Sequence, residues 1–83
     1  MDRNEVFAEL RTRASEVLRV EPERITEDAR FGDDLNADSL DLVELVIALE
    51  EHYDVRMPEE ELEDLVTVGD ALNLLLGKLS ARA

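Results

Sequence analysis

The stretch 34-DLNADSLDLVELVIALEEH-52 decides the fold of this chain, because a polar loop passes there into a helix with two apolar stripes. At about 100° per residue, the helix places aliphatic side chains on two nearly opposite faces. One face holds Leu42, Leu45, Val46 and Leu49, and the other holds Leu40, Val43 and Ile47. In a large protein such a helix would be buried on both sides. A chain of 83 residues has too few other elements for that, so we expect the first stripe in the core and the second exposed.

The residues before this helix predict one further helix and a loop. Apolar residues recur at three- and four-residue spacing from Asn4 to about Leu18, which predicts an amphipathic helix. Residues 20–32 contain a proline and a glycine and have no sustained period, so we expect a long loop there. Its candidate core anchors are Val20, Ile25 and Phe31.

The residues after the central helix predict a short helix and a long one. Pro58 suits the first turn of a short helix that continues through Leu65. Thr67 and Asp70 form a capping pair for a last helix. The inward stripe of that helix comprises Val68, Ala71, Leu72, Leu75, Leu76 and Leu79. The sequence therefore predicts an all-α fold, a small four-helix bundle of three longer helices and a short third one. We expect one domain over residues 1–83, with a core at about 4–79 and a short flexible C-terminal tail.

The net charge of −13 is unevenly distributed. Residues 1–30 carry eight acidic side chains and six arginines, whereas residues 31–77 carry fourteen acidic side chains and a single arginine, Arg56. Such an acidic half repels nucleic acid and anionic lipid, and it attracts partners with Lys/Arg patches. We expect a docking surface there, and a surface that only keeps the protein in solution is the alternative. The acidic run 59–64 is expected to be the solvated face of a helix and not a metal site.

The chain contains no cysteine and no apolar run of membrane-spanning length. The missing cysteine excludes a disulfide framework and a cysteine nucleophile, so any thiol chemistry must come from an attached group. The N-terminal residues lack the basic and apolar regions of a signal peptide. We therefore expect a cytoplasmic protein, monomeric and without membrane insertion.

Ser39 stands where the polar loop becomes the helix, and three chemistries compete for it. A serine nucleophile needs a base within hydrogen-bond reach, but the only histidine, His52, lies about 20 Å further along the helix. Oxygen-bearing residues alternate over 34–38 as in a calcium loop, but Ser39 and Leu45 replace the required glycine and glutamate. Covalent modification remains, since the amides and dipole at a helix start favour a phosphate ester. Simple helix capping by Asp38 and Ser39 is the alternative, and the apolar stripe that begins at the next residue favours modification.

The motif Asp38-Ser39-Leu40, followed by the acidic helix through Glu51, resembles the modification motif and recognition helix of acyl carrier proteins. Met57-Pro58-Glu59-Glu60 and Thr67-Val68 occur at matching spacing. The resemblance covers residues 31–75, with weaker agreement in the first helix. The fold implied by the resemblance is the same acyl-carrier-like helical bundle.

The resemblance implies that Ser39 receives 4′-phosphopantetheine from coenzyme A through a phosphopantetheinyl transferase, which also supplies Mg²⁺. The thiol of that arm would hold an acyl group as a thioester, so the protein would be a carrier and not an enzyme. By similarity, Asp38 would help to organise the metal and substrate of the transferase. Partner enzymes with basic patches would dock on Leu40, Asp41, Val43, Glu44, Ile47, Glu50 and Glu51. The candidate residues of an acyl pocket are Phe31, Leu49, Met57, Leu62, Leu65 and Ala71.

Four positions depart from the family pattern. Asn36 replaces a glycine, and because asparagine tolerates a left-handed backbone, the turn is expected to survive. Arg19 replaces a glycine that often ends the first helix, so we expect that helix to end differently. Leu62 and Gly32 stand where Ala and Val are more common. A bulkier Leu62 would narrow an acyl cavity, and Gly32 would open it nearby.

The pathway has more than one interpretation. The aspartate before the serine favours an acyl over an aminoacyl carrier, and a freestanding chain favours a dissociated system. The Asp-Ser-Leu-Asp and Val-Glu-Leu-Val context favours fatty acid synthesis. A dedicated carrier in a polyketide or other natural-product pathway is the alternative. An acidic helical adaptor with an unmodified serine is a third hypothesis, from a different class of protein.

Overall fold

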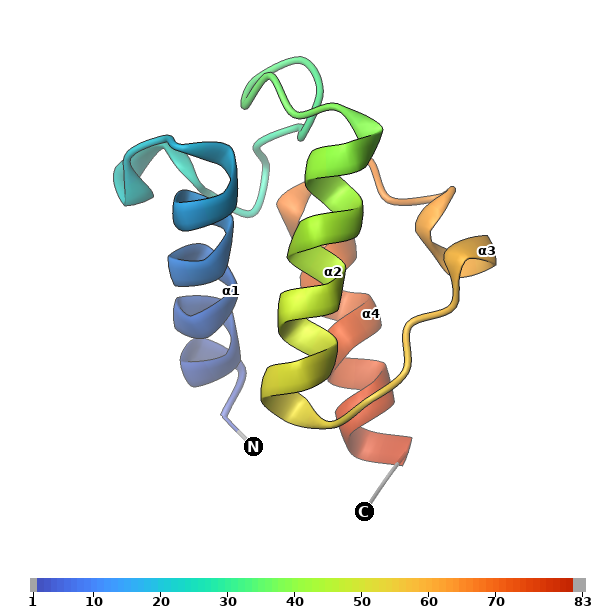
Figure 1. The fold of residues 1–83 in the computed structure, drawn as a ribbon. Helices are drawn as coiled ribbons and strands as arrows, with labels where there is room; N and C mark the ends of the chain where they lie inside the picture. The colour runs from blue at the N-terminus through green and yellow to red at the C-terminus, as the bar shows by residue number, and fades with distance from the viewer. Residues whose placement is uncertain (1, 82–83) are drawn as a thin grey trace.

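The computed structural model describes residues 2–81, which form four α-helices and one 3₁₀ turn. In chain order these are α1 (Arg3–Leu18), η1 (Pro22–Arg24), α2 (Ser39–Tyr53), α3 (Glu59–Leu62) and α4 (Val68–Ala81). The helix α1 packs against both α2 and α4. Figure 1 shows α2 antiparallel to α1, α4 running in the same direction as α2, and the short α3 at the edge of the group. The predicted all-α bundle of three longer helices and one short helix is confirmed.

The core is made of aliphatic and aromatic side chains, and no buried residue within 2–81 is polar or charged. The three long helices contribute Val6, Leu10, Ala14, Leu45, Val46, Leu49, Val68, Ala71, Leu72, Leu75 and Leu79. The first stripe of α2 is therefore in the core, apart from the half-buried Leu42. The stripe of α4 is buried apart from the half-buried Leu76. Each large aliphatic side chain that is fully buried contributes about 1.5–3 kcal/mol.

The end of α1 departs from the expectation for Arg19. This residue adopts the left-handed conformation that a glycine would provide, with φ 58° and ψ 44°. The helix α1 therefore ends with the same left-handed residue that a glycine would provide in the family pattern, and the expectation of a different end was wrong. The Ser15 hydroxyl donates a hydrogen bond of 2.6 Å to the Val20 carbonyl, which ties the chain after Arg19 back to the helix.

The long loop between α1 and α2 contains the turn η1, which the sequence pattern did not predict. Ile25 and Phe31 are buried anchors, as expected, and Val20 is half-buried. The loop is joined to the start of α4 by short antiparallel pairing, since the amides of Phe31 and Val68 donate to the carbonyls of Val66 and Ala29. These bonds measure 3.0 and 2.9 Å. They fix the loop that precedes α2 against the bundle.

The third and fourth helices differ in length from the prediction. We expected a third helix through Leu65, but α3 ends at Leu62 and a turn follows, in which the Leu65 amide donates to the Leu62 carbonyl. The expected tail began after residue 79, yet α4 continues through Ala81. The rest of that tail, residues 82–83, lies outside the described residues. Within residues 2–81, none of the helices combines the length and the hydropathy that a membrane span requires.

Candidate functional site

Ser39 is the first residue of α2, and its neighbours form a reciprocal cap around it. The Asp41 amide donates to Asp38 Oδ1 at 2.9 Å, and the Asp38 amide donates to Asp41 Oδ2 at 3.2 Å. Two carboxylates thus satisfy two amides at the helix start. Both Asp38 and Asp41 therefore have a structural role, besides any role toward a partner.

The turn before Ser39 is held in place by its backbone. Asn36 has φ 57°, so the left-handed conformation expected at this position is confirmed. The buried Leu35 side chain anchors the turn on one side. On the other side, the Ala37 amide donates to the Phe31 carbonyl at 2.7 Å. Ser39 itself is exposed, and it follows a turn that these contacts hold in place.

The geometry disfavours the two competing chemistries of Ser39. His52 lies in the last turn of α2, and its Nε2 is 3.7 Å from Glu9 Oε1 on α1, so it pairs across the helices and away from the serine. Asp34 Oδ2 accepts a 2.8 Å hydrogen bond from the Arg30 amide, and Asp38 caps α2. The carboxylates of Asp34 and Asp38 in the apparent calcium loop thus accept hydrogen bonds from backbone amides. Across residues 2–81, no cluster of three or more His, Cys, Asp or Glu side chains is arranged to hold a metal ion.

Two of the three residues in the second stripe of α2 are exposed, as the sequence predicted. Leu40 is 64% and Ile47 is 47% exposed, whereas Val43 is half-buried and faces a pocket. Among the acidic docking candidates, Glu44 and Glu51 are exposed. Glu50 is different, because its Oε2 accepts a 2.8 Å hydrogen bond from the Met57 amide. Glu50 therefore fastens the loop that leads to α3.

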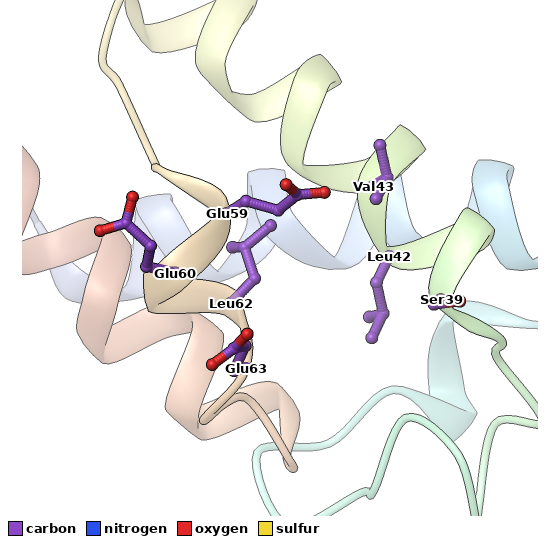
Figure 2. Close-up of a pocket in the computed structure, with 7 residues that line it drawn as sticks. All are labelled: Ser39, Leu42, Val43, Glu59, Glu60, Leu62 and Glu63. Atoms are coloured by element: carbon purple, nitrogen blue, oxygen red, sulfur yellow. The ribbon is translucent and has the colours of Figure 1, made fainter.

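A pocket of about 380 Å³ opens between α2 and α3 beside Ser39 (Figure 2). Its wall consists of Ser39, Leu42, Val43, Glu59, Glu60, Leu62 and Glu63. Figure 2 shows Glu59 extending from α3 toward Val43, while the carboxylate of Glu60 points away from α2. The pocket thus combines aliphatic side chains with a rim of carboxylates.

Of the six candidates for an acyl pocket, Leu62 is the one that lines this pocket. Leu65 lies instead on a second pocket of about 350 Å³ between α3 and α4. The remaining four, Phe31, Leu49, Met57 and Ala71, are at most 3% exposed in the core. The sequence reasoning missed Leu42 and Val43 as wall residues. The available signal was the place of Val43, which lies at the edge of the second stripe and borders the gap between the stripes, whereas Leu42 lies inside the first stripe and gave no such signal.

The fold and the site define a small helical domain with an exposed serine at the start of its second long helix. The family model described as "Phosphopantetheine attachment site" matches residues 8–75. The acyl carrier protein of Thermosynechococcus vestitus is 43% identical over 81 residues, which covers 98% of this chain and all of that protein. The acyl carrier protein of Borreliella burgdorferi is 47% identical over 75 residues, or 90% of this chain and 94% of that protein.

Two solved structures share the fold. The crystal structure of an acyl carrier protein from Thermotoga maritima superposes with a TM-score of 0.87 at 28% identity and covers 100% of this chain and 96% of that one. The acyl carrier protein from Enterococcus faecalis gives a TM-score of 0.76 at 31% identity, with coverage of 94% and 99%. The chain belongs to the acyl carrier protein family. Membership makes it a non-catalytic carrier and implies a 4′-phosphopantetheine prosthetic group.

Proposed function

We propose that Ser39 is the attachment residue for 4′-phosphopantetheine and that the protein carries acyl intermediates of a dissociated fatty acid biosynthetic system. The observation that carries this proposal is the exposed position of Ser39 at the first residue of α2, next to the exposed Leu40. When bound, the group supplies a thiol that holds an acyl chain as a thioester. Ser39 supplies the hydroxyl oxygen for the phosphate ester.

The residues around Ser39 suit a phosphate ester. The Asp38 side chain and carbonyl accept hydrogen bonds from the amides of Asp41 and Leu42. This arrangement leaves the amides of Ser39 and Leu40 for phosphate oxygens, at the positive end of the helix dipole. Asp38 lies directly beside the hydroxyl and is proposed to support the transfer reaction within the transferase, which brings its own Mg²⁺.

The surface next to Ser39 suits transient docking of several enzymes. Leu40 and Ile47 provide exposed apolar contact, and Val43 borders them. Glu44 and Glu51 add negative charge beside these apolar residues, which together form a ridge on α2. The carboxylates of Asp41 and Glu50 add further charge, although each also accepts a hydrogen bond from a backbone amide. The family implies a phosphopantetheinyl transferase and biosynthetic enzymes as partners. We propose that basic patches on these enzymes meet this ridge, because complementary charge speeds encounter more than it tightens binding.

The pocket between α2 and α3 is proposed to receive the first part of an acyl chain, with Leu62 in its wall. The other candidates, Phe31, Leu49, Met57, Leu65 and Ala71, would contact a longer chain only after the packing around them rearranges. We further propose that residues 1–83 act as one monomeric domain in the cytoplasm. A polyketide or other specialised pathway is the alternative to fatty acid synthesis.

The attachment site is tested by incubating the protein with coenzyme A, Mg²⁺ and a broad-specificity phosphopantetheinyl transferase, with intact mass as the readout. We expect the mass to rise by one phosphopantetheine. The Ser39→Ala variant should gain nothing, and Ser80→Ala, which removes another exposed serine, should behave like the parent protein. No gain in the parent protein would favour the unmodified adaptor.

The pathway is tested separately with the loaded protein as the sole carrier in a reconstituted dissociated fatty acid synthase. We expect acyl chains that lengthen by two carbons per cycle, read by mass on the protein. Efficient phosphopantetheine transfer without any elongation would favour a specialised pathway instead.

A further inference from the structure

The pocket wall formed by α3 depends on contacts outside that helix. The helix consists of four residues, Glu59–Leu62, and has no side-chain cap at its start. A single turn of this kind is not stable by itself. The chain just before it is fastened by the hydrogen bond from the Met57 amide to Glu50. The position of α3 itself must therefore be set by its contact with another element.

Two contacts serve this purpose: the half-buried Leu62 packs against the core, and an ion pair joins α3 to α4. Lys78 Nζ lies 2.9 Å from Glu61 Oε1 and 2.8 Å from Glu61 Oε2, and the two side chains are 28% and 39% exposed. The Oε2 atom is itself buried, and no group in the described part of the chain donates a well-aligned hydrogen bond to it. The nearby ammonium group compensates its charge. Lys78 is also the only lysine in the sequence.

The charges around α3 make this compensation important. Glu59, Glu60, Glu63 and Asp64 surround Glu61 along the chain, and all are negative. If Lys78 lost its charge, a buried carboxylate oxygen would remain uncompensated next to four other carboxylates. Breaking a partly buried pair in this way is more costly than replacing both partners by neutral groups. The expected relief is for α3 to move away from α4 into solvent.

We propose that Lys78 is a positioning residue which, through Glu61, holds α3 in place and thereby sets the access of an acyl chain to the pocket beside Ser39. Leu62 follows Glu61 directly and forms part of that pocket wall, so a displaced α3 displaces the wall. The part of the proposal that concerns the acyl chain rests on the proposed function. The part that concerns the position of α3 does not.

The position of α3 is tested by amide hydrogen exchange on the unmodified protein. The reporting amides are those of Glu61 and Leu65, which donate to the carbonyls of Pro58 and Leu62 at 3.0 and 3.1 Å. Lys78→Met should accelerate their exchange by about five- to tenfold, while the amides of α1 and α2 stay unchanged. Lys78→Arg should restore slow exchange. Arg56→Met is the matched control, because it removes one positive charge from the neighbouring loop and leaves the pair intact.

A double variant separates the pair from a general effect of charge. Glu61→Gln combined with Lys78→Met leaves no buried charge uncompensated, so its exchange should be slower than that of Lys78→Met alone. Exchange in Lys78→Met equal to that of the parent protein overturns the proposal. Additive acceleration in the double variant, or equal acceleration by Arg56→Met, overturns it as well.

The consequence for the acyl chain is tested on protein loaded with a hexanoyl group. In the parent protein and in Lys78→Arg, the hexanoyl group should slow α3 exchange relative to the arm alone. In Lys78→Met it should have little effect, although loading is complete by mass. Equal slowing in Lys78→Met would refute the role of Lys78 in chain access. Failure to load the parent protein would refute the proposed function instead, and the exchange result on unmodified protein would still stand.

Discussion

At the scale of single residues, Asp38 combines a cap with a proposed role in modification. Asp38→Ala removes the acceptor of the Asp41 amide and should lower the free energy of unfolding by about 1 kcal/mol. Asp38→Asn keeps a good cap and should leave stability nearly unchanged. Both variants should slow phosphopantetheine transfer, since both lose the carboxylate. Urea denaturation and initial transfer rates measure the two effects. Transfer to Asp38→Asn at the parental rate would show that Asp38 is only a cap.

Arg19 is a second residue at which a single substitution is informative. Its left-handed backbone, with φ 58°, costs an ordinary side chain about 1 kcal/mol. Arg19→Gly should therefore raise the free energy of unfolding by several tenths to about 1 kcal/mol. Ala8→Gly, at an exposed position inside α1, should lower it by about 1 kcal/mol. Chemical denaturation compares the two variants, and a loss of stability in both would contradict the assigned role of the Arg19 backbone.

At the scale of elements, the register of α2 was predictable, whereas α3 was predicted as a short helix but with the wrong end, for a physical reason. The two stripes of α2 repeat over four turns, so the register, the buried face and the exposed Leu40 and Ile47 followed from the sequence. The helix α3 has a single turn, and its acidic residues fit a helix or a turn equally well. Its end at Leu62 and its pairing with Lys78 depend on tertiary contact.

Most of the wall of the pocket beside Ser39 was missed for a related reason, since Leu62 is the one predicted acyl-pocket residue that lines it. It forms where the edge of α2 meets α3, so its wall depends on how two elements approach each other. Helical periodicity assigns Leu42 to the first stripe and Val43 to the second. It does not predict which other element of the fold packs beside these two residues. Residue identities carried over from a family pattern pointed to core positions such as Phe31 and Leu49 instead.

The start of α4 gives a prediction for pH. The amides of Thr67 and Val66 donate to Asp70, both at 3.0 Å, and these bonds hold the pKa of Asp70 below its ordinary value of 3.8. A lowered pKa in the folded state means that Asp70 stabilises the fold above pH 3.8, and this contribution is lost as the pH falls through the lowered pKa. The stability difference between the parent protein and Asp70→Ala should thus be full at pH 6 and shrink in strong acid. A difference that is constant down to about pH 2, measured by urea denaturation, would refute this role.

At the scale of the whole molecule, the net charge of −13 should make stability depend on salt. Most of the unbalanced acidic residues lie in 31–77, and their mutual repulsion is screened by ions. Moderate salt should therefore raise the melting temperature. A variant with Glu59, Glu60 and Glu63 changed to glutamine should show a shallower dependence. A melting temperature that does not respond to salt in the parent protein would contradict this prediction.

Added salt should weaken docking, although it should stabilise the fold. Salt screens the attraction between the acidic ridge on α2 and a basic partner surface, so affinity for the cognate transferase should fall as ionic strength rises. Leu40→Ala should weaken binding about tenfold, or ~1.4 kcal/mol, without changing the salt dependence. Glu44→Gln with Glu51→Gln should flatten the salt dependence, and Glu23→Gln on η1 is the control. Equal affinity of the parent protein at low and high salt would refute the docking surface.

The most direct measurement is to load the protein from hexanoyl-coenzyme A with the transferase, fragment the peptide that contains Ser39, and treat a second sample with hydroxylamine. The account predicts that hexanoyl-phosphopantetheine is attached at Ser39 and that hydroxylamine removes the hexanoyl group while the phosphopantetheine stays. Modification at another residue, or an acyl group that resists hydroxylamine, would contradict the assignment of Ser39 as the residue that carries the thioester arm.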